Sequence, residues 1–357
     1  MASQKIRGET DIWFAPTRIS VKDFGPIGQA DIELRPLTVL MGPNDTGKTY
    51  MAMLLLAART IVDRLRHRYH IMPKSPDPRV FVFLISEIVE SLEQLYSVNG
   101  LSQLVREGAE TANIHYTLKA SNPPGPEDTN LGIRLSVPKA GSTSCEHTIP
   151  SGRPWMPAVV IAPSERSGIL RAHDQLTQRM GELLSLLPHT SRYNVMKHIM
   201  SEGVGRIRLQ GCAEVLLAQV LGIDRYSSSD RALKHLEDIL QGFVELGEDL
   251  SIIYTRNDGL RLNLTSTSSM VSEVSAIYIL TALLYPGSWF IIEEPEAHLH
   301  PNSQVSMARF LTALVRLGVN VLITTHSDLI VRKLGNMVGL AQLKARGCRW
   351  GTGITNT

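Results

Sequence analysis

The sequence is poor in cysteine, in aromatic residues and in net charge. Its 357 residues include three cysteines and 6% aromatic residues, with 36 basic against 34 acidic side chains. Cys145, Cys212 and Cys348 lie far apart and have no metal-binding spacing, which argues against a disulfide framework or a zinc site. We therefore expect reduced thiols in a cytoplasmic protein. A net charge of +2 gives no global field that would attract nucleic acid or membranes, so any basic surface must be local.

The sequence also has no uninterrupted membrane segment. Its first residues contain no apolar core of a signal peptide. Residues 274–292 carry no charged side chain, but Pro286 and Gly287 interrupt the run and Glu293 follows it at once. We predict a buried helix followed by a buried strand here rather than a membrane span.

Hydrophobic periodicity predicts an α/β protein with strands at both ends of the chain. Predicted strands cover 19–24, 30–34, 37–41, 113–118, 131–137, 145–149, 158–162, 251–256, 260–264, 289–293 and 320–324. One predicted helix begins at Tyr50. Further predicted helices cover 80–96, 169–222, 230–247, 273–285, 302–317 and 327–334. The β–α–β order of the last hundred residues predicts a parallel sheet covered by helices.

Residues 42–49 match the phosphate-loop pattern GxxxxGK[ST], between a predicted strand and a predicted helix as the motif requires. Backbone N–H groups of such a loop and the helix N-terminus face phosphate oxygens, and the helix dipole favours their negative charge. We predict that Lys48 reaches the β- and γ-phosphates of ATP and that the Thr49 hydroxyl binds Mg²⁺. The predicted nucleotide-binding residues of this segment are Gly42, Pro43, Asn44, Asp45, Thr46, Gly47, Lys48, Thr49 and Tyr50.

Two further strands end in polar side chains. The apolar strand 289–293 runs into Glu293 and Glu294, and the strand 320–324 is followed by His326. Strand ends of open α/β sheets deliver side chains into the crevice where ligands bind. Successive residues of a strand point in opposite directions, so we predict that Glu293 holds Mg²⁺ through water while Glu294 polarises the attacking water. We predict that His326 senses the γ-phosphate or that water.

Four segments resemble the ABC-type ATPase heads of the overcoming-lysogenisation-defect (OLD), RecF and SMC-like group. They are the phosphate loop, Phe290–Glu296 with the following Ala-His-Leu-His-Pro, Thr324–Ser327 and the segment 265–273. The string Glu-Glu-Pro-Glu-x-His-Leu-His-Pro is more specific to that group than the phosphate loop. The resemblance covers residues 15–65 and 230–335, while Ala162–Ser167 resembles a short element of small stand-alone members.

The resemblance implies a two-lobed P-loop NTPase head with a β-rich N-terminal lobe, a parallel core sheet and an inserted helical lobe. We expect an N-terminal ATPase lobe over 1–65, an inserted arm or helical lobe over 66–250 and a C-terminal ATPase lobe over 251–357. The chain ends soon after His326, so we expect a small OLD-type AAA ATPase without the nuclease domain of larger OLD proteins.

The resemblance also implies that two heads close head-to-tail over two ATP molecules. The signature segment of one head, here with Ser268 and Ser269, would then meet the γ-phosphate bound by its partner. Such groups supplied in trans can lower the barrier to phosphoryl transfer strongly. Residues 297–300 would form the loop at the dimer seam, which is a better explanation of His298 and His300 than a metal pair.

Three positions depart from the family pattern. Met270 stands where a glycine usually follows the signature serines, Asp45 stands where a smaller residue is common, and no clear glutamine follows the strand 158–162. Three residues there are candidates for orienting water: Ser164, Glu165 and Arg166.

The sequence thus favours Mg²⁺-dependent ATP hydrolysis by a homodimer, with phage defence (an antiviral role) or DNA repair as possible contexts by family analogy. The alternative is an ATP-gated sensor or scaffold with little turnover that recruits a separate effector protein, motivated by Met270 and by the missing glutamine. DNA binding is a third hypothesis, based on basic stretches at 64–79 and 332–349, although both also suit solvated surfaces. A transporter subunit is disfavoured, and no membrane partner is expected.

Overall fold

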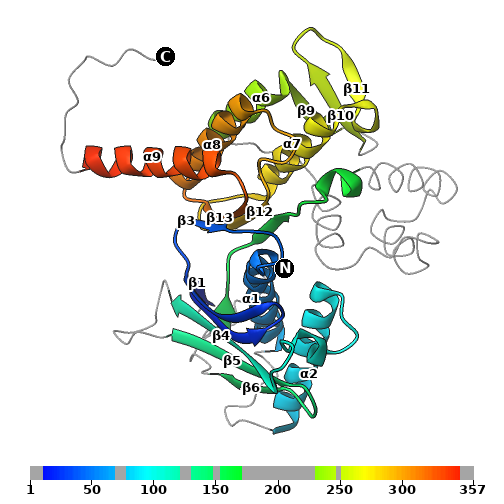
Figure 1. Ribbon diagram of the computed structural model, residues 1–357, viewed down its shortest axis with the longest axis vertical. Helices are drawn as coiled ribbons and strands as arrows, with labels where there is room; N and C mark the ends of the chain where they lie inside the picture. The colour runs from blue at the N-terminus through cyan, green and yellow to red at the C-terminus, as the bar shows by residue number, and fades with distance from the viewer. Residues whose placement is uncertain are drawn as a thin grey trace, which may run out of the picture.

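The structure, a computed structural model, describes residues 11–68, 78–120, 130–147, 153–170, 230–246 and 251–345. Figure 1 shows two lobes: a β-rich lobe that also contains helices α1 and α2, and a lobe with a small parallel sheet and helices α6 to α9. Most of the helix predicted over 169–222 lies outside the described residues, as do Cys212 and Cys348.

The β-rich lobe is built on one antiparallel sheet of order β2-β1-β4-β5-β6, with β7 pairing in parallel with β1. Its strands are β1 (Asp11–Phe24), β2 (Ile27–Glu33), β4 (Thr111–Ala120), β5 (Asn130–Pro138), β6 (Ser144–His147) and β7 (Arg153–Trp155). Side chains alternate along them, as in β4, where Ala112, Ile114, Tyr116 and Leu118 are buried. One face therefore packs on α1 (Lys48–Arg68) and α2 (Pro78–Tyr96).

This sheet crosses the division expected at residue 66. Strands β4, β5 and β6 fall within the segment 66–250 that was expected to be an inserted arm, yet β4 pairs with β1 over eight residues of β1. The sequence order alone does not reveal this pairing, because the partners lie about a hundred positions apart. Strands β4, β5 and β6 are therefore part of the N-terminal β-lobe.

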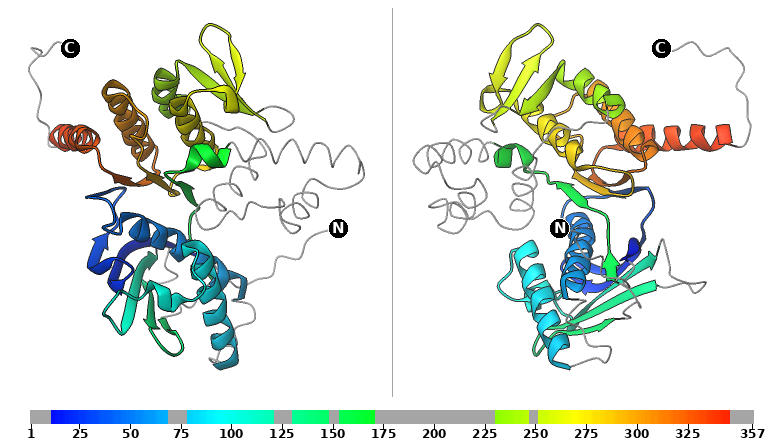
Figure 2. Two further views of the ribbon diagram at one scale, coloured as in Figure 1. Left: turned by 45° about the vertical axis from the view of Figure 1, so that its right-hand side comes forward. Right: turned by 180° about the vertical axis from the view of Figure 1, so that it is seen from behind.

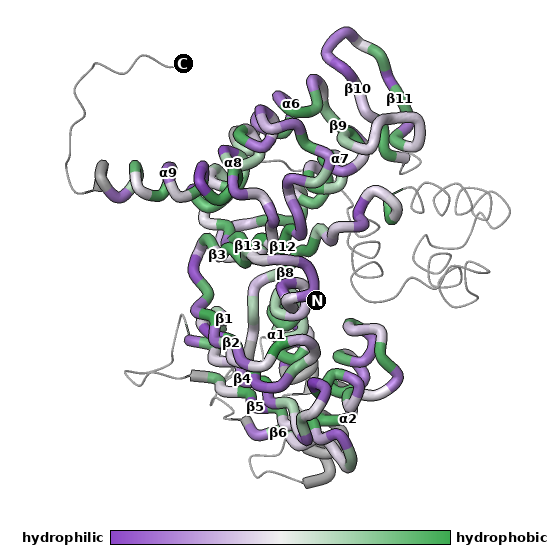
Figure 3. Tube along the Cα trace, in the orientation of Figure 1, coloured by the Kyte–Doolittle hydropathy of each residue, from purple (hydrophilic) through white to green (hydrophobic). Residues whose placement is uncertain are grey.

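The second sheet is parallel, with order β3-β13-β12-β8. It comprises β3 (Leu37–Met41), β13 (Asn320–Thr325), β12 (Trp289–Glu293) and β8 (Val159–Ala162). Both faces are covered: Ile161, Ile291 and Leu322 pack into the core that contains α1, whereas Phe290 and Ile292 pack into the core that contains α7 and α8. Hydrophobic residues consequently run along these strands without polar alternation, as Figure 3 shows for β12 and β13.

The covering helices are α6 (Asp230–Leu240), α7 (Ser269–Leu280), α8 (Pro301–Arg316) and α9 (Asp328–Ala345). They lie on the side of the parallel sheet opposite α1, as the two views of Figure 2 show. Because the sheet is parallel, β3, β12 and β13 all end at the same edge, and residues from the two ends of the chain meet there. In the described part of the chain, no helix is long and apolar enough to cross a membrane.

The prediction of helix over 230–247 is wrong at its end. Helix α6 stops at Leu240, and Gly242–Leu246 forms β9, which pairs with β10 (Ile252–Arg256) beside β11 (Arg261–Asn263). Gln241 has a φ of +52°, which ends the helix. A Cβ at Gly242 would lie 2.3 Å from the carbonyl oxygen of Thr255, so only glycine allows this close approach. The predicted hairpin around Asn257–Gly259 is confirmed.

Candidate nucleotide-binding site

The phosphate loop connects the edge of the parallel sheet to helix α1. It follows β3, and α1 begins at Lys48. Gly47 has a φ of +87°, and a Cβ on it would lie 2.4 Å from Cγ1 of Ile27, the first residue of β2. Glycine is thus required here both for the backbone conformation and for the packing of the β-lobe against the loop.

Hydrogen bonds within the phosphate loop fix its conformation. The Lys48 ammonium donates hydrogen bonds to the carbonyl oxygens of Gly42 at 2.9 Å and Pro43 at 2.5 Å, and the Thr46 hydroxyl donates to Pro43 at 2.9 Å. The first turn of α1 has no acidic residue. Its free N–H groups, its dipole and a lysine amine therefore give one positive end to the site.

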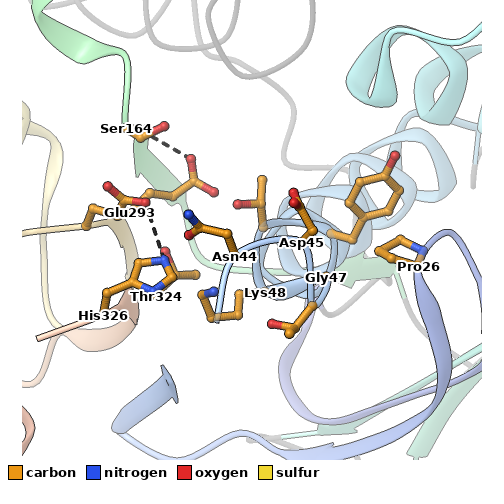
Figure 4. Close-up of a pocket in the computed structure, with 13 residues that line it drawn as sticks. Pro26, Asn44, Asp45, Gly47, Lys48, Ser164, Glu293, Thr324 and His326 are labelled. Carbon is orange, nitrogen blue, oxygen red and sulfur yellow. Dashed lines mark hydrogen bonds and ion pairs between the residues drawn. The ribbon is translucent and has the colours of Figure 1, made fainter. Parts of the chain in front are cut away.

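The loop lines a cavity of about 540 Å³ together with the ends of β8, β12 and β13. In Figure 4, Lys48 and Asn44 face Glu293, Ser164 and His326 across this space. The lining residues are Pro26, Asn44, Asp45, Thr46, Gly47, Lys48, Thr49, Tyr50, Ser164, Glu293, Glu294, Thr324 and His326. Of the predicted site residues, Gly42 and Pro43 contribute through the carbonyls that hold Lys48, while Ser268 and Ser269 lie outside the cavity.

Glu293 is the buried acid of the site, with 4% of its surface exposed. Its Oε2 accepts a hydrogen bond from the backbone N–H of Ser164 at 3.2 Å, whereas its buried Oε1 has no hydrogen-bond partner. Burial raises the pKa of the Glu293 carboxyl above its usual value, and hydrogen bonds from Thr49 and from the Ser164 N–H only partly oppose this.

These observations fit a Mg²⁺ ion. A buried carboxylate oxygen without a partner needs either a proton or a cation, and the neighbouring Thr49 hydroxyl supplies a second oxygen ligand. Mg²⁺ prefers oxygen ligands and retains several of its waters, which an open cavity permits. Thr49 and Glu293 are the two residues predicted from the sequence to bind Mg²⁺, and this role stays a prediction.

Glu294 turns away from Glu293 and toward His326. Its φ of +45° lies in the left-handed region, and its N–H donates to the carbonyl oxygen of Thr324 at 2.8 Å. Glu294 Oε1 lies 3.7 Å from Nε2 of His326, and the side chains are 42% and 34% exposed. The adjacent acids thus differ in environment: Glu293 is buried, while Glu294 can meet water in the cavity.

Glu296 is a structural part of the site that the sequence did not identify. Its Oε1 accepts hydrogen bonds from the Thr325 hydroxyl at 2.7 Å, from the His326 N–H at 2.7 Å and from the Ser327 N–H at 3.1 Å. One carboxylate oxygen therefore holds the whole loop that carries His326. The signal available in the sequence was the third acid of the Glu-Glu-Pro-Glu string.

The three candidates for orienting water have different positions. Ser164 lines the cavity, and Glu165 is exposed outside it. Arg166 points into the interior with only 1% of its surface exposed and pairs with Glu273 of α7, its Nε lying 2.9 Å from Oε2. Charged residues that follow a strand are usually exposed to solvent, so the sequence did not predict this buried ion pair.

The signature segment forms the start of α7. Ser268 caps the helix, its Oγ accepting the N–H of Val271 at 3.4 Å. Ser268 and Ser269 are exposed, and Met270 packs partly against the core. His300 caps α8 through its Nδ1, and no cluster of metal-ligating side chains occurs within the described ranges.

One protein family matches part of this chain. Residues 188–332 match the family model described as "AAA domain, putative AbiEii toxin, Type IV TA system". No curated protein matches the sequence.

Several solved structures are similar at low sequence identity. The Smc head domain of Pyrococcus furiosus bound to the C-terminal domain of ScpA is 14% identical, with a TM-score of 0.48, covering 90% of this chain and 92% of that one. The SMC head domain of Thermotoga maritima is 10% identical, with a TM-score of 0.42 and coverages of 89% and 91%. The recombination mediator RecF (RecF-ATPrS) of the RecFOR pathway is 14% identical, with a TM-score of 0.41 and coverages of 90% and 94%.

The family match ends inside α9 and includes the acidic strand end and the His326 loop, while the phosphate loop lies outside it and is identified by its own motif and geometry. A phosphate loop, an acidic strand end and a polar third strand end thus surround one cavity at the edge of a parallel sheet. The matched residues 188–332 make up less than half of the chain, and they are similar to an AAA domain.

Proposed function

We propose that this chain binds ATP together with Mg²⁺ in the cavity described above and hydrolyses it as a head-to-tail homodimer. The observation that carries the proposal is one cavity with opposite ends of complementary charge: the Lys48 ammonium and the start of α1 on one side, and Glu293 with an unpartnered oxygen on the other. A triphosphate with a divalent cation has the matching charges.

The residues have distinct tasks in this mechanism. Lys48 exchanges its contacts with the loop carbonyls for phosphate oxygens, and the N–H groups of the loop and of α1 bind the remaining charge. Thr49 and Glu293 would hold Mg²⁺, and the bound ion would supply positive charge that offsets the charge of the phosphates. Glu294 orients the attacking water and accepts its proton, and Nε2 of His326, 3.7 Å from the Glu294 carboxylate, faces the same water.

The proposed dimer rests on the position of the signature segment. Ser268 and Ser269 are exposed at the N-terminus of a twelve-residue helix, yet neither lines the cavity of its own chain. Hydroxyl groups and free N–H groups at a helix start suit a phosphate from a second molecule. We therefore propose that α7 of one chain completes the cavity of its partner.

The second candidate is an ATP-gated sensor with low turnover that recruits an effector protein. Met270 favours it, because its side chain packs partly into the core and leaves less room for a phosphate beside the start of α7 than glycine would. Robust phosphate release by the isolated protein would exclude this candidate. DNA binding, DNA repair and phage defence stay predictions, and parts of the basic stretches (69–77 and 346–349) lie outside the described residues.

The proposal is tested by calorimetry, light scattering and phosphate release with Mg-ATP. We expect Lys48→Ala to abolish the heat of ATP binding and Glu294→Gln to retain binding, lose turnover and accumulate a dimer. Glu165→Gln is the matched control, since this nearby acid is exposed but does not line the cavity. Wild-type turnover by Glu294→Gln would refute the assigned base, and unchanged ATP binding by Lys48→Ala would refute the site.

A further inference from the structure

The guanidinium of Arg166 fills the gap where two strands of the parallel sheet separate. The ladder between β8 and β12 ends at Ala162 and Ile292. Beyond that point Arg166 donates to three carbonyl oxygens: those of Pro163 at 3.0 Å, Glu293 at 2.8 Å and Glu294 at 3.2 Å. Buried carbonyl groups require donors, so Arg166 fixes the backbone of both predicted site acids.

The same guanidinium is tied to the signature helix. Its Nε lies 2.9 Å from the Glu273 carboxylate and 3.3 Å from the Glu273 carbonyl oxygen, and both side chains are almost fully buried. Burial lowers the pKa of Arg166, and the Glu273 carboxylate is the largest opposing influence. A buried charge of this kind must be paired, so the contact cannot open without a large cost.

Glu273 stands five residues after the cap Ser268 on α7. At a rise of about 1.5 Å per residue, this separation is about 7.5 Å along a rigid helix. A displacement of Glu293 and Glu294 at the end of β12 is therefore passed by the Arg166 side chain to Glu273. From Glu273 it reaches the exposed N-terminus of α7 over less than two helical turns. No other described ion pair links α7 to the β8 and β12 strand ends.

We propose that Arg166 is a positioning residue that couples the ATP cavity of its own chain to the N-terminus of α7, the segment offered to a partner chain. This inference rests on the proposed function and adds a route for regulation: nucleotide bound in one cavity sets the position of Ser268 and Ser269 for the opposite cavity. A purely local role, in which Arg166 only satisfies carbonyl groups, predicts no such communication.

The experiment compares Arg166→Lys and Glu273→Gln with the wild type. Lysine keeps the charge but lacks the planar set of donors, and glutamine keeps the shape of the acid but not its charge. The matched control is Leu236→Ala, which removes a fully buried side chain from α6 in the same core and leaves the ion pair intact. Three quantities are measured: ATP affinity, amide hydrogen exchange of residues 268–273 with and without Mg-ATP at concentrations where the protein is monomeric, and ATP-driven dimerisation in the Glu294→Gln background.

We expect both variants to bind ATP within threefold of the wild type, to lose the ATP-dependent change in exchange at 268–273, and to dimerise at least tenfold more weakly. Leu236→Ala should retain the ATP-dependent change. Wild-type exchange changes and dimerisation in both variants would overturn the inference. So would a loss of ATP affinity in proportion to dimerisation, because that pattern indicates a local role. A wild-type chain that does not bind ATP would refute the proposed function itself, and the inference with it. Since the variants change opposite ends of the contact, Glu273→Gln serves as the test if Arg166→Lys does not fold.

Discussion

Replacing Glu296 by glutamine tests how the catalytic arrangement is held. The carboxylate oxygen Oε1 accepts three hydrogen bonds from the loop that carries His326. A hydrogen bond to a charged group contributes about 1.5–3 kcal/mol, against about 0.5–1.5 kcal/mol for a neutral one. Glutamine keeps one acceptor oxygen of the same reach, so each bond weakens by about 1 kcal/mol and the loop loses about 2–3 kcal/mol of stabilisation.

This loss should appear in turnover rather than in binding. Glu296 does not line the cavity. His326 does, and Nε2 of His326 lies 3.7 Å from Oε1 of Glu294. If about half of the lost stabilisation is expressed as misplacement of His326, kcat falls about tenfold, because 1.4 kcal/mol corresponds to a factor of ten. The affinity for ATP, set mainly by the phosphate loop, should change less than twofold.

The assay is steady-state phosphate release combined with calorimetric titration of ATP. Asp328→Asn is the matched control, because this exposed acid near the same loop accepts none of the loop's hydrogen bonds described above and should behave as the wild type. A Glu296→Gln variant with wild-type kcat would refute the argument that one carboxylate positions the His326 loop. A fall in ATP affinity equal to the fall in kcat would show that the residue instead supports the whole cavity.

Three further perturbations have clear expected outcomes. Asp45 is exposed in the phosphate loop with a φ of +59°. Asp45→Gly should tighten ATP binding by about threefold to tenfold in calorimetry, since a like charge near phosphate costs about 1 kcal/mol. An ATP affinity of Asp45→Asn equal to that of the wild type would show that the charge does not matter. The pKa of Glu293 is raised in the folded protein, so its protonated carboxyl stabilises the nucleotide-free protein at pH values below the pKa that Glu293 has in the unfolded chain. This contribution is lost as the pH rises through the pKa of Glu293 in the folded protein, and the thermal midpoint should fall across that window. A Glu293→Gln variant with the same pH dependence would contradict the assignment. Gly242→Ala should lower the free energy of unfolding by about 2 kcal/mol or more, because the new Cβ would lie 2.3 Å from a carbonyl oxygen; an unchanged denaturant midpoint would contradict the close approach.

The sequence predicted the elements around the cavity well because each carries a strong local signal. The phosphate loop is a contiguous motif. The strands β12 and β13 are short apolar runs buried on both faces, and β3 is a short apolar run at the sheet edge, so their ends were predictable to within a residue. Polar residues after those strands converge because parallel strands end at one edge. The lining residues Lys48, Thr49, Glu293, Glu294 and His326 therefore came together as expected.

Features that depend on distant partners were not predictable. The pairing of β4 with β1 joins positions about a hundred residues apart, and nothing local marks it. The end of α6 depends on the close approach of Gly242 to Thr255, which a helical hydrophobic pattern conceals. The buried contact of Arg166 with Glu273 contradicts the usual exposure of charged residues, and only the folded chain shows that each neutralises the other.

The order of strands in the parallel sheet has a consequence for biosynthesis. Among the described strands, β3 pairs with β13, so the phosphate loop is anchored to a strand that emerges from the ribosome almost three hundred residues later. The antiparallel β-lobe can assemble from residues 11–147 while translation continues, because domains form as their segments are synthesised. The strand that precedes the phosphate loop therefore lacks its neighbour in the sheet until residues 320–325 have been made.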